Sequence, residues 1–181
     1  MALDGIEIAD YDPDWPRLFQ AESEALAPVL NALPLVGLEH IGSTAVPGLA
    51  AKPIIDILAI VEDLEYARTN LPEPMAGIDY VFWADNPTQD RLFFVKGMPP
   101  HGERRTHHVH VCQPGPLVDR HILFRDYLRA HPTEAAAYAV LKRRLAAEHT
   151  ADREGYTAAK NAFVERVVAL AERWCTLRAK P

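Results

Sequence analysis

The chain has 181 residues, of which 49% are hydrophobic and 24% are charged, and its formal net charge is −6. These values are ordinary for a soluble globular protein, so they exclude a wholly disordered chain, and the length predicts one domain over residues 1–181. The acidic balance disfavours binding to a nucleic-acid backbone, so we expect no nucleic-acid partner.

The N-terminal part of the sequence predicts an arm followed by a helix. Residues 6–8 fit a short strand or an extended arm. Asp12 and Pro13 are typical of a helix N-cap and a first helical position, and apolar residues recur at helical spacing over 15–33. Pro28 interrupts this pattern, so we expect it to kink or end the helix.

Two strands and an intervening turn come next. Residues 38–41 predict a short strand, which runs into Gly42-Ser43-Thr44, a turn that opens a helical turn. The run IIDILAIV at 54–61 holds a single charge, Asp56. Such a nearly continuous apolar run predicts a central strand that is buried on both faces.

The middle of the chain predicts a helix and three more strands. The expected elements are a helix at 63–70 capped by Asp63, strands at 80–83 and 91–96 joined by a turn at 84–87, and a strand at 106–112. In the last strand, His108 and His110 share one face because side chains alternate. Cys112 shares this face if the strand stays regular to its end.

The last third predicts helices, with apolar residues at helical spacing over 117–128, 138–145 and 156–177. Tyr138 with Lys142, and Tyr156 with Lys160, fit helix-surface pairs in which the lysine stem packs on the ring. Structural roles are expected for the core candidates Trp15, Trp83 and Trp174 and for the neighbours Arg125 and Asp126.

The segment EHIGSTAVPGLAAKPIID carries the most informative chemistry. A strand that ends in Gly42 and Ser43 before a helical turn points free N–H groups at an anion, with Thr44 adding a hydroxyl and Lys52 a charge. An ionised Asp56 in an apolar strand is costly unless it is paired or bound to a metal. The segment therefore predicts a metal–phosphate site. The alternative is a tight turn and an aspartate that bonds the nearby backbone.

The strings HIGSTAVPGLAAKPIIDI, RTHHVHVCQPG, LFRDYLRAHP and YTAAK resemble the GrpB family of small bacterial proteins, over nearly the whole chain. The resemblance implies a nucleotidyltransferase-like α/β (α+β) fold, a mixed sheet flanked by helices with a C-terminal helical layer. In that superfamily a Gly-Ser turn holds nucleotide phosphates, and three carboxylates hold two Mg²⁺ ions for nucleotidyl transfer. By position, Gly42 and Ser43 match the turn, and Asp56 matches the first, catalytic carboxylate.

Two departures from that pattern change the expected metal. Leu58 stands where a second carboxylate is expected, and strand 106–112 offers His108 and His110 where it would supply an acid. Imidazoles suit Zn²⁺ or Mn²⁺ better than Mg²⁺, so we expect Asp56 and the two histidines to converge on one divalent ion, Mg²⁺, Mn²⁺ or Zn²⁺. Glu39 is an additional candidate ligand. The alternative is that the histidines only line a pocket and bind phosphate.

The expected ligand is a nucleotide or another phosphorylated small molecule, with Arg91 and Arg105 as further phosphate-binding candidates. Each arginine alone also fits a solvated surface charge. The expected function is binding of this ligand or metal-dependent phosphoryl or nucleotidyl transfer. The alternative is a non-catalytic binder of a nucleotide or CoA-type ligand, since the family resemblance extends to fusions with dephospho-CoA kinase. An interaction module built on the helical tail ranks last.

The sequence also indicates a cellular compartment. Cys112 and Cys175 are too few for a disulfide scaffold, which favours reduced thiols in the cytoplasm. No apolar run reaches the roughly 18 residues of a membrane span, and we expect neither a signal peptide nor a membrane partner. Nothing in the sequence indicates the oligomeric state.

Overall fold

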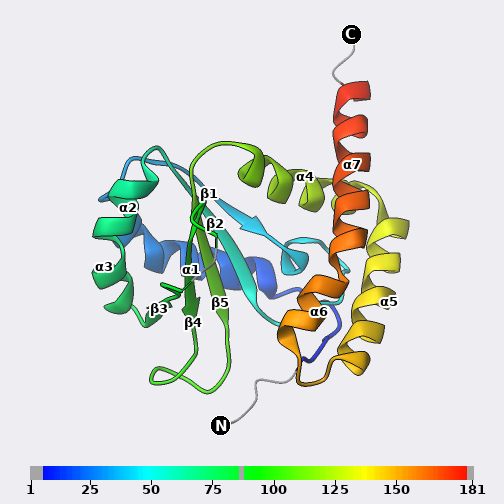
Figure 1. Cartoon of the computed structure of the whole chain (residues 1–181), viewed down its shortest axis with the longest axis horizontal. Helices are drawn as coiled ribbons and strands as arrows, with labels where there is room; N and C mark the ends of the chain where they lie inside the picture. The colour runs from blue at the N-terminus through cyan, green and yellow to red at the C-terminus, as the bar shows by residue number, and fades with distance from the viewer. Residues whose placement is uncertain (1–5, 86–87, 179–181) are drawn as a thin grey trace.

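The computed structural model describes residues 6–85 and 88–178, and it has a five-stranded mixed sheet with helices on both faces (Figure 1). This is the α+β arrangement that the sequence predicts. The elements in chain order are α1 (Trp15–Leu30), β1 (Leu35–Ile41), the 3₁₀ turn η1 (Ser43–Ala45), β2 (Ile55–Val61), α2 (Leu64–Asn70), α3 (Pro72–Ala76), β3 (Tyr80–Phe82), β4 (Leu92–Lys96), β5 (His107–Cys112), α4 (Pro116–Ala130), α5 (Pro132–Glu148), α6 (Arg153–Ala159) and α7 (Asn161–Arg178).

The strand order is β1-β2-β5-β4-β3, which makes β5 the middle strand. The pair β2–β5 is parallel, and the other neighbours are antiparallel. In the register of the parallel pair, Asp56 lies beside His108 and Leu58 beside His110. The topology therefore joins two segments that are 52 residues apart in the chain.

The predicted central strand is confirmed in β2. Ile57 and Leu58 are both fully buried, and they belong to different apolar clusters on opposite faces of the sheet. One face packs against α1, α2 and α3, and the other packs against α4. Burial on both faces explains why this segment is apolar throughout, apart from Asp56.

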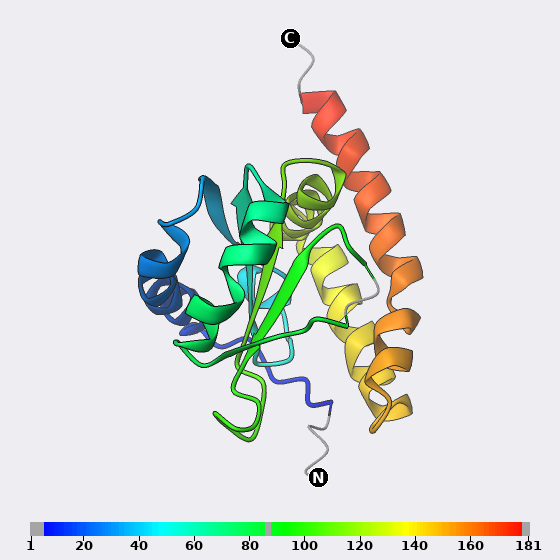
Figure 2. The same cartoon turned by 60° about the vertical axis from the view of Figure 1, so that its left-hand side comes forward.

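The helices form two layers around the sheet. Figure 2 shows α1, α2 and α3 on one side and the C-terminal helices α4 to α7 on the other. The C-terminal helices have an apolar cluster of their own, centred on Tyr127, Leu128, Tyr138 and Val167. This layer is the predicted C-terminal helical layer, and α7 extends past the rest of the body in both views. No helix among the described residues is long and apolar enough to cross a bilayer.

The boundaries of α1 correct one expectation. The helix begins at Trp15, after Asp14, and the Asp12 side chain instead accepts a hydrogen bond from the Asp14 N–H at 2.9 Å. The helix also continues through Pro28 to Leu30. Pro28 has no N–H to donate to the preceding turn, and the helix ends two residues after it.

Three other expectations concern chain ends and turns. The predicted Asp63 cap is confirmed, because its side chain accepts from the Tyr66 N–H at 2.9 Å. Residues 6–8 form an extended arm, which is followed by a single bridge between Ala9 and Ala51. The predicted turn at 84–87 includes positions 86 and 87, which lie outside the described residues.

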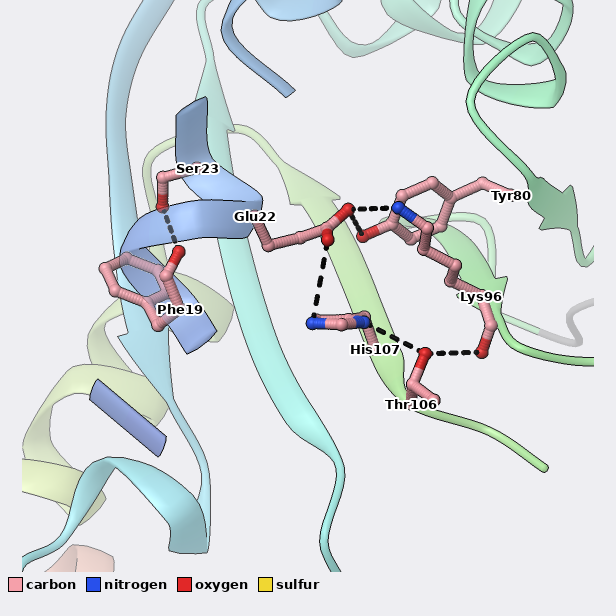
Figure 3. A network of polar contacts seen from close by, with 7 residues as sticks. All are labelled: Phe19, Glu22, Ser23, Tyr80, Lys96, Thr106 and His107. Carbon is pink, nitrogen blue, oxygen red and sulfur yellow. Dashed lines mark hydrogen bonds and ion pairs between the residues drawn. The ribbon is translucent and has the colours of Figure 1, made fainter. Parts of the chain in front are cut away.

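A buried polar network ties α1 to the sheet on the face opposite to Asp56 (Figure 3). Glu22 accepts hydrogen bonds from the Tyr80 hydroxyl at 3.0 Å and from Lys96 Nζ at 2.8 Å. His107 Nε2 lies 3.7 Å from the same carboxylate, and its Nδ1 lies 3.0 Å from Thr106 Oγ1. We refer to these five residues as the Glu22 network.

Candidate functional site

A cavity of about 1000 Å³ opens between the sheet and the C-terminal helices. Strands β2, β4 and β5, the η1 turn and helices α4, α5 and α6 all contribute to its wall. The predicted site residues that line it are Gly42, Ser43, Thr44, Lys52, Asp56, Arg91, Arg105, His108 and His110. The fold thus brings together every predicted site residue except Glu39.

Asp56, His108 and His110 form a compact group at this cavity, which we call the acid–histidine cluster. His108 Nδ1 lies 2.9 Å from Asp56 Oδ1, and His110 Nε2 lies 3.9 Å from the same oxygen. One ligand atom from each residue lies within 4.8 Å of the other two. The alternation of β5 and its parallel register with β2 produce this convergence.

The electrostatics of the cluster favour a charged carboxylate beside a neutral His110 imidazole. Burial alone would raise the pKa of Asp56, but the hydrogen bond with His108 and the interaction with His110 outweigh it and hold that pKa far below its usual range. Burial also lowers the pKa of His110, although Asp56 partly opposes this. The cluster therefore offers an anionic oxygen and ring nitrogens to a cation.

Two neighbours shape the space around the cluster. The Phe93 ring packs 5.0 Å from the His108 ring and 4.9 Å from the His110 ring, which shields one side of both imidazoles. Gly42 has φ +72°, and a Cβ there would meet Asp56 Oδ2 at a distance that real Cβ atoms essentially never show. Only glycine lets the turn approach the carboxylate this closely.

The hydroxyl groups of the turn already have partners inside the protein. Thr44 Oγ1 donates to the Ile54 carbonyl at 3.2 Å and lies 3.0 Å from His40 Nε2. The hydroxyl hydrogen that the sequence assigned to a phosphate is therefore used within the fold. The Ser43 side chain interacts with Tyr138 of α5 and partly opposes the rise that burial causes in the Tyr138 pKa.

Lys142, Tyr156 and Lys160 of the two Tyr–Lys pairs line the cavity, which corrects the expectation that these pairs lie on the helix surface. Lys160 Nζ lies 4.2 Å from the centre of the Tyr156 ring, and Lys142 Nζ lies 4.6 Å from that of Tyr138. The expected stacking is present, but both lysines line the cavity and Lys142 is only 2% exposed. Packing of α5 and α6 toward the sheet turns these faces inward.

The inward position lowers the pKa values of both lysines. Burial lowers the pKa of Lys142 to about 7, with Lys160 and Arg143 adding repulsion, and Lys142 Nζ donates to the Ala50 carbonyl. Burial lowers the pKa of Lys160 to about 8, while Asp56 opposes the shift. Lys52 Nζ lies 4.1 Å from the Tyr156 ring centre, so Tyr156 contacts two cations.

Aromatic rings also support the two predicted arginines. The Arg91 guanidinium lies 5.8 Å from the Phe93 ring centre, and that of Arg105 lies 5.3 Å from the Trp83 ring centre. Trp83 was expected in the core, but it is 44% exposed and lines the cavity, because it follows the short edge strand β3. Trp15 is buried as expected, and Trp174 is half-buried against the C-terminal cluster.

Glu39 lies outside the acid–histidine cluster. Its carboxylate accepts from Arg125 Nη1 at 2.6 Å, and Arg125 Nε donates to Asp126 at 2.7 Å. This arrangement joins α4 to β1 and gives Arg125 and Asp126 the structural contacts that were expected. Among the described residues, Glu39 therefore pairs with the Arg125 guanidinium and lies apart from the acid–histidine cluster.

Cys112 extends the histidine face of β5 but not the cluster. It packs in the apolar group of Ile41, Leu58 and Val118, and burial raises the pKa of its thiol to about 11. A protonated thiol in apolar surroundings is a poor metal ligand.

Among the cavity-lining groups that sequence reasoning missed are Lys142, Lys160 and His121. The string YTAAK and the repeated Tyr-x-x-x-Lys spacing signalled the lysines, whereas His121 had only its place in the apolar stripe of 117–128. The His121 ring lies 5.6 Å from that of His110, and burial lowers the pKa of His121 to about 4.

The fold and the site together define an α+β protein with a carboxylate–histidine cluster at a cationic cavity. The family model described as GrpB protein matches residues 5–169, and the chain belongs to this family. It is similar to a crystal structure of the conserved protein GrpB from Enterococcus faecalis, with 36% identity, a TM-score of 0.82, and coverage of 93% of this chain and 99% of that one.

Two curated relatives are longer than this chain. The UPF0157 protein PA4798 of Pseudomonas aeruginosa is 51% identical over 168 residues, which cover 93% of this chain and 68% of the relative. A protein named dephospho-CoA kinase, from Mycolicibacterium paratuberculosis, is 28% identical over 191 residues, which cover 93% of this chain and 46% of the relative. The chain thus spans less than half of that kinase.

Proposed function

We propose that the cavity binds a phosphorylated small molecule, of the nucleotide or CoA type, beside one divalent metal ion held by Asp56, His108 and His110. The observation that carries this proposal is the meeting of the acid–histidine cluster with a cationic wall in one cavity. Neither half alone would specify a phosphate ester with its counter-ion.

The cationic wall supports an anionic ligand. The basic residues that line the cavity include Lys52, Arg91, Arg105, Lys142 and Lys160. They gather in a protein with a formal net charge of −6, so their concentration is not a consequence of composition. Partly buried cations close together repel one another, and an anion relieves that repulsion. Phosphate groups match this requirement because they carry charge on several oxygens.

The donor set of the cluster fits a transition metal. One carboxylate and two imidazoles suit Zn²⁺ or Mn²⁺ better than Mg²⁺, which prefers oxygen ligands. Leu58, at the position of a second carboxylate, is fully buried among apolar side chains. The acid–histidine cluster therefore supports one ion and not two. A bound ion would neutralise phosphate charge and polarise a phosphoryl oxygen.

The size of the cavity and one relative support the ligand class. Ligand cavities commonly measure about 300–1000 Å³, and this one, at about 1000 Å³, is large enough for a whole nucleotide. The relative named dephospho-CoA kinase contains a region similar to this chain. That similarity supports a CoA-type or adenine nucleotide as the first ligands to test.

A second candidate function is transfer or hydrolysis of a phosphoryl or nucleotidyl group. The observation behind this candidate is that the ionised Asp56 and Lys160, whose pKa is lowered, line the same cavity. Incubation with ATP and Mn²⁺ or Zn²⁺, followed by chromatography of the nucleotides, distinguishes the two. Product that forms with the wild type and not with Asp56→Asn supports transfer or hydrolysis. If ATP stays intact with the wild type, the binding function alone is supported.

Calorimetric titration of the metal-free full chain tests the binding proposal. The titrants are pyrophosphate, AMP and CoA, each with and without Mn²⁺ or Zn²⁺. Lys160→Met is expected to weaken binding of all three ligands, and Asp56→Asn is expected to remove the metal dependence. Arg144→Met is the matched control, because Arg144 is a solvent-exposed cation paired with Glu148 outside the cavity. Equal affinities in all variants would contradict the proposal.

A further inference from the structure

A third imidazole lies next to the two that form the acid–histidine cluster. His121 projects from α4 and lines the same cavity. Its ring centre is 5.6 Å from that of His110, with the planes inclined by 41°. His110 comes from the middle strand and His121 from the helical layer, so this contact joins the sheet to the helices at the site.

Three ring nitrogens of this group are buried without a hydrogen-bond partner within the described residues: His108 Nε2, His110 Nδ1 and His121 Nε2. Leaving a buried polar atom unpaired costs about 1–3 kcal/mol, and such atoms are uncommon in folded proteins. Three of them in one place indicate that the group takes on partners when a ligand binds.

The two nitrogens of His110 have different surroundings. Nε2 lies 3.9 Å from Asp56 Oδ1, on the side where the cluster converges, while Nδ1 is the nitrogen without a partner. An imidazole that ligates a metal through Nε2 keeps its proton on Nδ1, and ligating histidines nearly always donate that proton to an acceptor. An acceptor is therefore required beside His110.

We propose that His121 is the positioning residue that supplies this acceptor. With its own proton on Nδ1, His121 accepts the His110 Nδ1–H at Nε2, which fixes the tautomer and the orientation of the ligating ring. The inference rests on the metal site proposed above. No hydrogen bond joins the two rings in this structure, so metal binding requires a side-chain adjustment that brings the nitrogens together.

Metal titration of the full chain tests the role of His121. The metal-free protein is titrated with Zn²⁺ against a chromogenic chelator, and the absorption spectrum of its Co²⁺ form is recorded. His121→Leu is expected to weaken Zn²⁺ binding by about 10–100-fold, the usual cost of losing an outer partner of a ligand. His121→Gln, whose amide oxygen accepts a hydrogen bond, is expected to restore most of the affinity and the wild-type spectrum.

Ile122→Ala is the matched control. Ile122 is the next residue on α4 and packs against the apolar cluster of Ile41, Leu58 and Val118, so its truncation loosens the same helix without removing a nitrogen. We expect unchanged Zn²⁺ affinity in this variant. A loss equal to that of His121→Leu would show that helix packing, and not the imidazole, is responsible, and would overturn the inference.

Other outcomes are equally decisive. Unchanged affinity and spectrum in His121→Leu overturn the positioning role. A Gln variant as weak as the Leu variant, with a changed Co²⁺ spectrum, would identify His121 as a direct ligand and also overturn it. Absence of Zn²⁺ and Co²⁺ binding in the wild type overturns the metal site with the inference. The effect of Lys160→Met on pyrophosphate binding is measured separately. Failure of the phosphate-binding proposal can therefore be distinguished from failure of the role of His121.

Discussion

On each face of the sheet a carboxylate lies next to a histidine of β5: Glu22 of α1 on one face and Asp56 of β2 on the other. The two sites differ in how completely their polar atoms are paired. In the Glu22 network, the carboxylate accepts from Lys96 and Tyr80, and His107 has Thr106 on its other side (Figure 3). In the acid–histidine cluster, Asp56 meets two imidazoles whose outer nitrogens have no partner among the described residues.

This difference separates a structural group from a candidate binding site. The Glu22 carboxylate accepts from a lysine and a tyrosine hydroxyl and lies against the main apolar core. Its hydrogen-bonding needs are therefore met by the protein itself. The acid–histidine cluster borders a cavity of about 1000 Å³, and two of its ring nitrogens have no hydrogen-bond partner among the described residues. Buried polar groups that stabilise a fold have hydrogen-bond partners within the protein, whereas those of a binding site gain partners from the ligand.

The largest expected effect on stability comes from breaking the Glu22 network. In Glu22→Leu, Lys96 keeps its charge and Tyr80 its hydroxyl, but both lose their main acceptor. Loss of one partner of a buried pair costs about 3–5 kcal/mol of unfolding free energy. Urea denaturation measures this cost, and Zn²⁺ affinity of the folded fraction should not change. Glu24→Gln, an exposed glutamate of the same helix, should stay within about 0.5 kcal/mol of the wild type.

Asp56→Asn makes the corresponding change on the cavity face and is expected to act on binding more than on stability. The variant loses the only carboxylate of the cluster, so Zn²⁺ affinity should fall by more than the roughly 100-fold upper cost of an outer partner. Unfolding free energy should fall by roughly 1.5–3 kcal/mol, less than in Glu22→Leu, because the variant loses a charged hydrogen-bond acceptor but keeps an amide oxygen that can accept from His108. A stability loss as large as that of Glu22→Leu would end the distinction between the two faces.

The buried lysines predict a pH dependence that only the cavity face has. Lys142 and Lys160 have pKa values lowered to about 7 and about 8, and each must be protonated to attract a phosphate. Affinity for AMP should therefore fall as pH rises from 7.5 to 9.5, by up to about tenfold per pH unit for each proton required. The phosphate is already doubly ionised in this range, since its second pKa is about 6.

Calorimetry across that pH range measures the effect. Lys160→Arg should flatten the part of the dependence that Lys160 contributes, because an arginine stays charged. An affinity for AMP that is constant from pH 7.5 to 9.5 in the wild type would show that neither lysine contacts the phosphate.

The smallest expected effect compares two glycines that share a positive φ. Gly42 has φ +72° and Gly48 has φ +78°, so alanine at either position is strained, at a cost of about 1–3 kcal/mol. A Cβ at Gly48 meets nothing within 4 Å, whereas one at Gly42 meets the Asp56 carboxylate. Thermal unfolding should show a larger loss in Gly42→Ala, because the added Cβ also crowds the Asp56 side chain. Zn²⁺ affinity should fall in Gly42→Ala alone, and an equal fall in both would assign the effect to the backbone.

The sequence determined most of the local structure and the identity of the residues that form the acid–histidine cluster. The apolar run around Asp56 predicted a strand buried on both faces, and the alternation of β5 placed His108 and His110 together. These inferences succeeded because the side-chain period of a strand is fixed by covalent geometry. The string around Gly42 likewise located the turn that approaches the carboxylate.

Tertiary packing decided which faces of the helices look into the cavity. A Tyr-x-x-x-Lys pair has the same spacing on a solvent-exposed helix as on one that lines a site, so Lys142 and Lys160 read as surface residues until α5 and α6 met the sheet. Glu39 fits a metal ligand by its place on β1, yet Arg125 of α4 pairs with it. His121 matched an apolar stripe, and only the contact of α4 with β5 brought it beside His110. Sequence periodicity fixes which residues share a face, but the partner of that face is set by contacts between distant segments.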